Sequence, residues 1–227
     1  MSFYSLRLRS FLFPRLVLVC LMLLVLARAQ QAPPEVAFTC DFPGSDPSHY
    51  GISVRSDGHA SYVSDGKLAK DADSDEPFRM EFTVSPATTA RIFDIAKKTN
   101  YFAGDIDSKK KNIASTGSKT LVYKDAQRNT VATYNYSPVP AIEEITTLFQ
   151  GLSTTLEFGR RLEYDYRYQK LALDEELKRM DDLSGRGGVP EVAAIAPILQ
   201  KIMNDPSVIN GVRARAQRLL ERDGAGK

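Results

Sequence analysis

The chain has 227 residues, of which 43% are hydrophobic, 26% charged and 9% aromatic. This composition is typical of a globular protein and excludes collagen-like, low-complexity and disulfide-scaffold chains. Because 30 lysines and arginines stand against 28 acidic residues, the formal net charge is only +2. So weak a charge does not favour nucleic acid as a partner.

The first residues of the chain predict an export signal. Three arginines precede the unbroken apolar run 16–27, and an A-x-A cleavage pattern ends at Ala29. A helix over this run would be about 18 Å long, short of the roughly 30 Å hydrocarbon core of a membrane. We therefore predict cleavage between Ala29 and Gln30, and a periplasmic or secreted mature protein without a membrane span.

Removal of the signal changes the charge and the cysteine content. Four arginines and no acids are lost, which leaves 26 basic and 28 acidic residues. Cys40 is then the single cysteine, so the mature chain can form no intrachain disulfide although its compartment permits one. We expect a buried, unreactive thiol at Cys40.

The residues after the signal predict an antiparallel sheet. Alternation of apolar and polar residues predicts strands over 35–40, 49–55, 59–62, 78–84, 119–124 and 130–136. The turn Ser56-Asp57-Gly58 joins the second strand to the third. A three-residue loop with Gly58 in the left-handed conformation sets Val54 opposite Ala60, and the burial pattern favours this register over a two-residue turn.

One helix is predicted between the fourth and fifth strands. Ser85 offers an N-cap and Pro86 suits the first helical turn, so a helix should run to about Lys98. Neighbouring strands with one inserted helix predict an α+β fold: a small antiparallel sheet with one or two helices packed on one face, followed by an all-helical C-terminal extension.

The extension begins with a helical pattern from about 140 to 183. Gly151 and Gly159 weaken it locally, so one kinked helix and two consecutive helices are both open. The predicted organisation is a signal peptide (1–29), a lead-in linker (30–34), a sheet domain (35–150), a long helix (151–183), a Gly-rich linker (184–189), a helical hairpin (190–222) and a tail (223–227).

The helical hairpin is predicted as helices 190–203 and 206–222, with Asp205 as N-cap and Pro206 in the first turn of the second. This Asp-Pro pair, the Val212-Arg213 pair and Pro197 resemble a single HEAT-type repeat, although Pro206 and Val212 are two residues too far apart. The resemblance implies a protein-binding scaffold. Because a lone repeat cannot bury its apolar face, we expect the hairpin to pack on the preceding long helix.

The order of elements in the sheet domain also resembles that of small exported bacterial domains of unknown function. A lead strand, a hairpin at an Asp-Gly turn, a strand leading into a Ser-Pro helix and a second hairpin carry this likeness over 35–149. It implies a fold and no activity.

His49 and His59 are the only histidines and thus the candidates for a catalytic base or a metal ligand. The predicted hairpin register separates them by roughly 20 Å, which excludes a shared zinc site. Asp46 and Ser48 complete, with His49, the residue types of a serine hydrolase, but neighbouring side chains on a strand point to opposite faces. A hydrolase or metal-dependent enzyme using either histidine is the alternative hypothesis.

Four acidic residues alternate like the opening of a calcium loop: Asp71, Asp73, Asp75 and Glu76. An EF-hand needs glycine where Glu76 stands and glutamate where Phe82 stands, so a solvated acidic loop is favoured. A cation-binding module is the third hypothesis. No cofactor motif is present, and we predict no cofactor.

The helical region carries two sets of candidate partner-binding residues: Tyr164, Tyr166 and Tyr168, and Arg215, Arg218 and Arg222. Tyrosines spaced by two fan across different helix faces, so at least one should be exposed or lie at a contact. The arginines oppose the negative end of the helix dipole, which favours a solvated face over an anion site.

These patterns together favour a non-enzymatic, exported bacterial protein, a protein-interaction or structural module of the cell envelope. The expected partner is another envelope or secreted protein. The sequence leaves the oligomeric state open.

Overall fold

The structure is a computed structural model that describes residues 32–66, 77–110 and 112–225. The predicted signal peptide and the acidic run 71–76 lie outside the described residues, so the structure does not test either prediction. The described residues from Pro34 onward form one compact unit.

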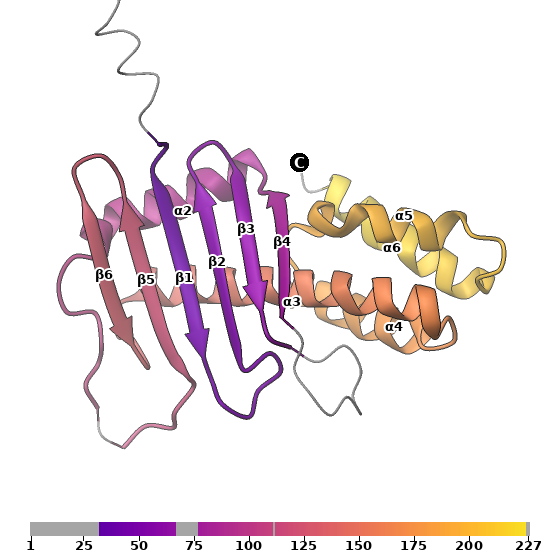
Figure 1. Cartoon of the computed structure of the whole chain (residues 1–227), viewed down its shortest axis with the longest axis horizontal. Coiled ribbons are helices and arrows are strands. Elements are labelled where there is room, and N and C mark those ends of the chain that lie inside the picture. Colours follow the sequence, from indigo (N-terminus) through magenta and orange to yellow (C-terminus); the bar gives the residue numbers. More distant parts are fainter. Residues whose placement is uncertain (1–31, 67–76, 111, 226–227) are drawn as a thin grey trace, which may run out of the picture. The chain divides into compact units, whose positions relative to one another are not determined.

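Six strands form one sheet in the order β4-β3-β2-β1-β5-β6, and every neighbouring pair is antiparallel (Figure 1). The strands are β1 Glu35–Asp41, β2 His49–Arg55, β3 His59–Ser64, β4 Phe78–Thr83, β5 Ser118–Lys124 and β6 Asn129–Tyr134. The predicted α+β class and antiparallel sheet are therefore confirmed.

The β2–β3 hairpin has the register predicted from its burial pattern. Val54 lies opposite Ala60 and Ile52 opposite Tyr62. Gly58 has a φ of 85°, in the left-handed region that glycine adopts without strain. The alternative register would have turned the buried side chains of one strand toward solvent.

Two helices cover one face of the sheet, α2 Pro86–Lys98 and α3 Pro140–Tyr168 (Figure 1). Ser85 caps α2 as predicted, with its Oγ accepting a hydrogen bond from the backbone N–H of Thr88 at 3.3 Å. In the core, the ring of Phe38 on β1 stacks on Phe149 of α3 with centroids 5.3 Å apart. The opposite sheet face carries cross-strand hydroxyl pairs, including Ser53 with Ser61.

The C-terminal part is helical and packs beside β4. Its elements are α4 Leu173–Ser184, the 3₁₀ helix η2 Val192–Ile195, α5 Ala196–Asn204 and α6 Asn210–Ala225; a further 3₁₀ helix, η1 Asn100–Phe102, follows α2. The helix α3 crosses the predicted boundary at residue 150 and extends past β4 to meet the other helices (Figure 1). Sheet and extension therefore share one helix.

The long helical pattern forms two helices, and the break lies at residues 169–172 rather than at a glycine. Both glycines of α3 are positions of close approach. A Cβ on Gly151 would lie 2.8 Å from Pro190 Cδ, and one on Gly159 would lie 2.4 Å from Ile195 Cγ2. They allow the segment before α5 to pack directly on the α3 backbone.

The predicted start of the last helix at Pro206 is wrong, because α6 begins at Asn210. The carboxylate of Asp205 accepts the backbone N–H of Ser207 at 2.8 Å and binds Lys170 Nζ at 2.7 Å and the Tyr166 hydroxyl at 3.0 Å. Through these contacts, Asp205 and Pro206 form a turn that is bonded to the C-terminal end of α3 and to the residue Lys170 that follows it. As expected, α5 and α6 pack on the preceding helices, with α6 against α4 and α5 against α3.

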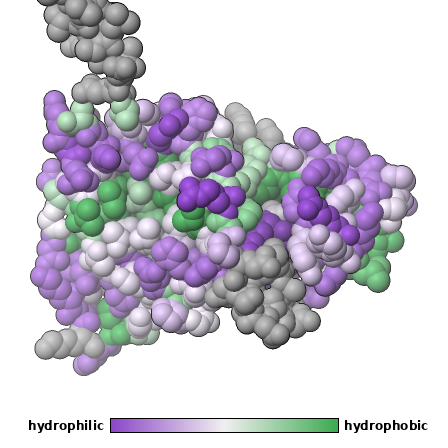
Figure 2. Space-filling view, in the orientation of Figure 1, coloured by the Kyte–Doolittle hydropathy of each residue, from purple (hydrophilic) through white to green (hydrophobic). Residues whose placement is uncertain are grey.

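The far end of the helical part carries a hydrophobic surface (Figure 2). Lys170 Nζ donates to Ser207 Oγ at 2.7 Å, which brings the α3–α4 and α5–α6 loops together. In these loops Leu171 is 87% exposed and Ile209 60% exposed. None of the helices in the described ranges is long and apolar enough to cross a membrane.

Candidate functional site

Among the described residues, the outer edge of β4 has no partner strand. The backbone N–H of Val84 donates to Gly58 O at 2.9 Å, so these two residues form a hydrogen-bonded pair at the end of β3 and β4. In an antiparallel pair, every second residue of a strand bonds to its neighbour. Arg79 and Glu81 are the residues in between, so their backbone N–H and C=O groups point away from β3. No residue of the described chain hydrogen-bonds to them.

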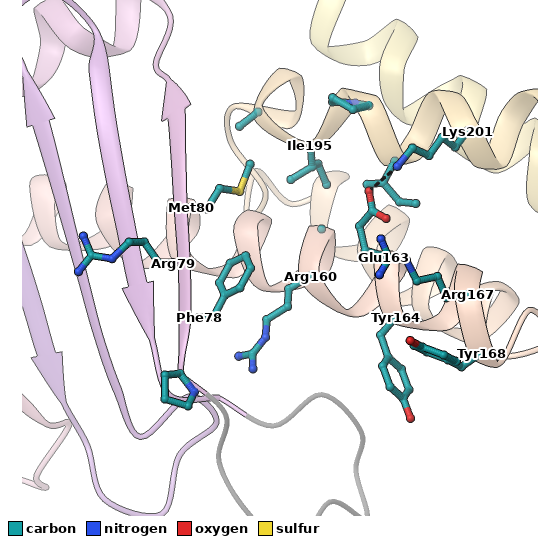
Figure 3. Close-up of a pocket in the computed structure, with 15 residues that line it drawn as sticks. Phe78, Arg79, Met80, Arg160, Glu163, Tyr164, Arg167, Tyr168, Ile195 and Lys201 are labelled. Carbon is teal, nitrogen blue, oxygen red and sulfur yellow. Dashed lines mark hydrogen bonds and ion pairs between the residues drawn. The ribbon is translucent and has the colours of Figure 1, made fainter.

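A groove of about 590 Å³ lies beside this edge (Figure 3). One wall is the start of β4, the second is α3 between Gly159 and Tyr168, and the third is the segment from Ala194 to Lys201. The absence of a side chain at Gly159 lets Ile195 reach the α3 backbone, so the third wall is held close to the second.

Apolar side chains face each other across the groove. Phe78 and Met80 come from β4, and Ile195 and Ile198 come from η2 and α5. The alternation that buries Phe82 in the core continues to Phe78 and Met80, which are half-buried and line the groove. The groove thus offers apolar contacts directly next to unpaired backbone.

The charged lining of the groove is mainly basic. Of the fifteen lining residues, Arg79, Arg160, Arg167 and Lys201 are basic and Glu163 alone is acidic. Glu163 binds Lys201 Nζ at 3.0 Å. Arg167 forms no ion pair within the part of the chain that the structure describes. Arg79 points away from the groove, over the open face of the sheet (Figure 3).

Buried Glu157 on α3 helps to place Arg160. Its Oε1 accepts hydrogen bonds from the Tyr62 hydroxyl at 2.8 Å and from Ser64 Oγ at 2.6 Å, and its Oε2 lies 3.7 Å from Arg160 Nη1. Burial and the negative charge of Glu157 raise the pKa of Tyr62, which stays a donor. The Arg160 guanidinium lies 5.0 Å from the centre of the Phe78 ring, a cation–π distance.

The three candidate tyrosines have different surroundings. Tyr164 and Tyr168 line the groove with ring centroids 5.1 Å apart, and Tyr168 is 68% exposed. Their hydroxyls bind no other described residue. Tyr166 instead donates to Asp205. The prediction that at least one of the three is exposed is confirmed.

The three candidate arginines of α6 bind α4. Arg215 contacts Asp174 at 2.5 Å, and Asp181 receives Arg222 at 2.6 Å and Arg218 at 3.7 Å. These ion pairs join two helices of the extension, so the arginines are not part of the groove.

The structure does not bring His49 and His59 together. His49 is the first residue of β2 and His59 the first residue of β3. Because β2 and β3 are antiparallel, His59 lies beside the last residues of β2, at the other end of that strand from His49. His49 Nδ1 lies 2.5 Å from Asp41 Oδ1, whereas Ser48 Oγ donates to Asp65 Oδ2 at 3.2 Å. Ser48 and His49 therefore bind different carboxylates. Asp46 is exposed in the loop before β2.

The candidate calcium ligands Asp71, Asp73, Asp75 and Glu76 lie outside the described residues. Within the described ranges, no group of three or more histidine, cysteine, aspartate or glutamate side chains is arranged to hold a metal ion.

No protein-family model matches the chain, and no curated protein is similar to it.

Sequence reasoning missed the groove residues Met80, Arg160, Arg167 and Ile195. The alternation over 78–84 identified a strand with one buried face, and that face includes Met80. The α3 wall of the groove has a signal in the sequence. Arg160, Tyr164 and Arg167 are spaced at helical intervals, which places them along one side of the helix.

Proposed function

We propose that the protein is an exported, non-enzymatic interaction module of the bacterial cell envelope that holds a segment of another envelope or secreted protein in the groove beside β4. The observation that supports this proposal best is the β4 edge, which pairs with no other described strand and lies next to apolar and basic side chains. Export rests on the predicted signal peptide.

The groove has the size and chemistry of a binding site. Its volume of about 590 Å³ falls within the roughly 300–1,000 Å³ of ligand pockets. Exposed sheet edges in natural proteins are usually shielded, because unpaired backbone groups recruit other chains. In the part of the chain that the structure describes, no strand shields the β4 edge beside Phe78 and Met80, which supports a surface that a partner covers.

Site-specific photocrosslinking tests the proposal. The full chain with Met80→p-benzoylphenylalanine would be produced in bacterial cells and irradiated, and adducts would be identified by mass spectrometry. Lys97, exposed on α2 away from the groove, receives the same substitution as a matched control.

We expect an adduct with one exported protein from position 80 and none from position 97. The absence of any adduct at position 80 would contradict the proposal, as would the same adducts at both positions.

A further inference from the structure

We infer that the occupant of the groove is an extended acidic peptide segment, which adds to the sheet as a strand beside β4. This inference rests on the proposed function, and it specifies both the backbone geometry and the charge of the partner segment.

The backbone of β4 supplies the first argument. Arg79 and Glu81 each present an N–H and a C=O on the outer edge, two residues apart, which is the spacing that a neighbouring strand pairs with. Main-chain bonding of this kind gives strand addition its affinity with little regard to sequence. The groove lies along this edge, so an added strand has room on the helical side.

The alternation of side chains supplies the second argument. Side chains of an added strand would point alternately to the two faces of the sheet, as those of β4 do. One set would enter the groove beside Phe78, Met80 and Ile195. The other set would lie on the open face, next to the exposed side chains of Arg79 and Glu81.

The charge of the groove supplies the third argument. The α3 and α5 walls carry Arg160, Arg167 and Lys201. Arg160 lies 3.7 Å from Glu157 and Lys201 binds Glu163, so Arg167 is the basic side chain of these walls that forms no ion pair with a described residue. A carboxylate entering from the partner would meet the Arg167 guanidinium, which has no acidic partner in the described chain. Hydrogen bonds between arginine and a carboxylate are among the stronger ones in proteins, and a basic segment would meet like charges here.

Fluorescence anisotropy with defined peptides tests both parts of the inference. The probe is a labelled nine-residue peptide of alternating valine and glutamate. Two comparison peptides are a version with lysine for each glutamate, and a version of equal charge that carries N-methyl groups on alternate backbone amides. The methylated peptide keeps its charge but loses the donors that strand pairing needs.

A pair of protein variants isolates the backbone contribution. Glu81→Pro removes the outward N–H, a change that edge strands tolerate when that donor faces solvent. Glu81→Ala removes the same side chain and keeps the N–H. Arg167→Gln removes the unpaired charge. Thermal unfolding of each variant checks that it is folded.

We expect the glutamate peptide to bind at least tenfold more tightly than either comparison peptide. Glu81→Pro should weaken binding at least tenfold relative to Glu81→Ala, and Arg167→Gln should weaken it several-fold relative to the unaltered protein.

Each contrary outcome would overturn a different part of the inference. Equal binding of the methylated peptide would exclude strand addition, and equal binding of the lysine peptide would exclude the acidic preference. If no peptide binds while position 80 still crosslinks to a partner, this inference fails and the proposed function stands. If no peptide binds and position 80 gives no crosslink, both the inference and the proposed function fail.

Discussion

The carboxylate of Glu191 accepts two hydrogen bonds from Ser85, one from its backbone N–H at 2.9 Å and one from its hydroxyl at 2.6 Å. It also accepts the hydroxyl of Thr88 at 2.5 Å. Ser85 follows β4 and caps α2, whereas Glu191 precedes η2. A side chain of the helical extension thus completes a helix cap in the sheet domain and fixes one wall of the groove to the end of β4.

Replacement of this carboxylate should destabilise the whole unit. Glu191→Ala leaves the partly buried donors of Ser85 and Thr88 without an acceptor, a loss of about 1–3 kcal/mol. Urea denaturation measures it. The exposed Glu221→Ala, which loses one contact with Gln217 on the same helix, should change the free energy of unfolding by less than about 0.5 kcal/mol. Equal effects of the two substitutions would refute the structural role of Glu191.

A methyl group on Gly159 should force η2 away from α3. Gly159→Ala places a Cβ 2.4 Å from Ile195 Cγ2, and overpacking of this kind costs typically about 1–3 kcal/mol. In an Ile195→Ala background the same change should cost less, because Cγ2 is absent. A double-mutant cycle by denaturation measures the difference, and strict additivity would show that the two residues do not clash.

Gly211 provides the matched control for this helical glycine. A Cβ there would meet no atom within 4 Å. Gly211→Ala should therefore stabilise the protein by up to about 1 kcal/mol through helix propensity alone. A destabilised variant would contradict the open surroundings of Gly211.

Asp165 should make the stability depend on pH. Burial, followed by the negative charge of Glu176, raises the pKa of Asp165 to about 6, against the lowering effect of Arg161 and Arg179. Between about pH 4 and pH 6 the folded state therefore binds more protons than the unfolded state, and stability falls as the pH rises through this window.

Asp165→Asn should remove this penalty. Because the side chain is partly exposed, we expect a gain of about 1 kcal/mol at pH 7 and none near pH 3, measured by denaturation at both values. A variant that gains nothing at pH 7 would show that Asp165 titrates normally.

Cys40 should resist alkylation in the folded chain that begins at Gln30, which lacks Cys20. Its thiol is buried on β1, and burial raises its pKa, so little thiolate is present or accessible at pH 8. Mass spectrometry after iodoacetamide treatment should find label only after unfolding. In the variant Gln127→Cys, at the exposed β5–β6 turn, one label should appear at once; two rapid labels would contradict the burial of Cys40.

We predict that the chain is exported and that its exported form begins at Gln30. Expression of the full sequence in a Gram-negative bacterium, followed by intact-mass measurement of the periplasmic and medium fractions, should give the mass of residues 30–227. Ala29→Asp alters the A-x-A cleavage pattern and should leave a longer chain. An intact mass that includes residues 1–29 from the unaltered sequence would exclude cleavage.

Local patterns in the sequence are sufficient to predict the β2–β3 hairpin and its register. The alternation of buried residues and the left-handed Gly58 both lie within a few residues of the turn, so they fix its register. The Asp205-Pro206 pair shows where local reading fails. It is a standard helix start, yet Tyr166 of α3 and Lys170 of the α3–α4 loop hold Asp205 in a turn.

The groove depends on pairings that lie far apart in the sequence. The alternation of 78–84 predicts a strand, but its place at the sheet edge follows from the pairing of β1 with β5, which no local signal specifies. The sequence alone marks Gly159 as a weak point of a helix. Its contact with Ile195 appears only once the chain has folded back on α3.

Backbone amide exchange tests the central claim most directly. With the alternating glutamate and valine peptide bound, the N–H groups of Arg79 and Glu81 should exchange with solvent at least tenfold more slowly than in the free protein. The backbone amide of Lys97, an exposed residue of α2 away from the groove, should not change. Unchanged exchange at Arg79 and Glu81 in the saturated complex would contradict strand addition at β4.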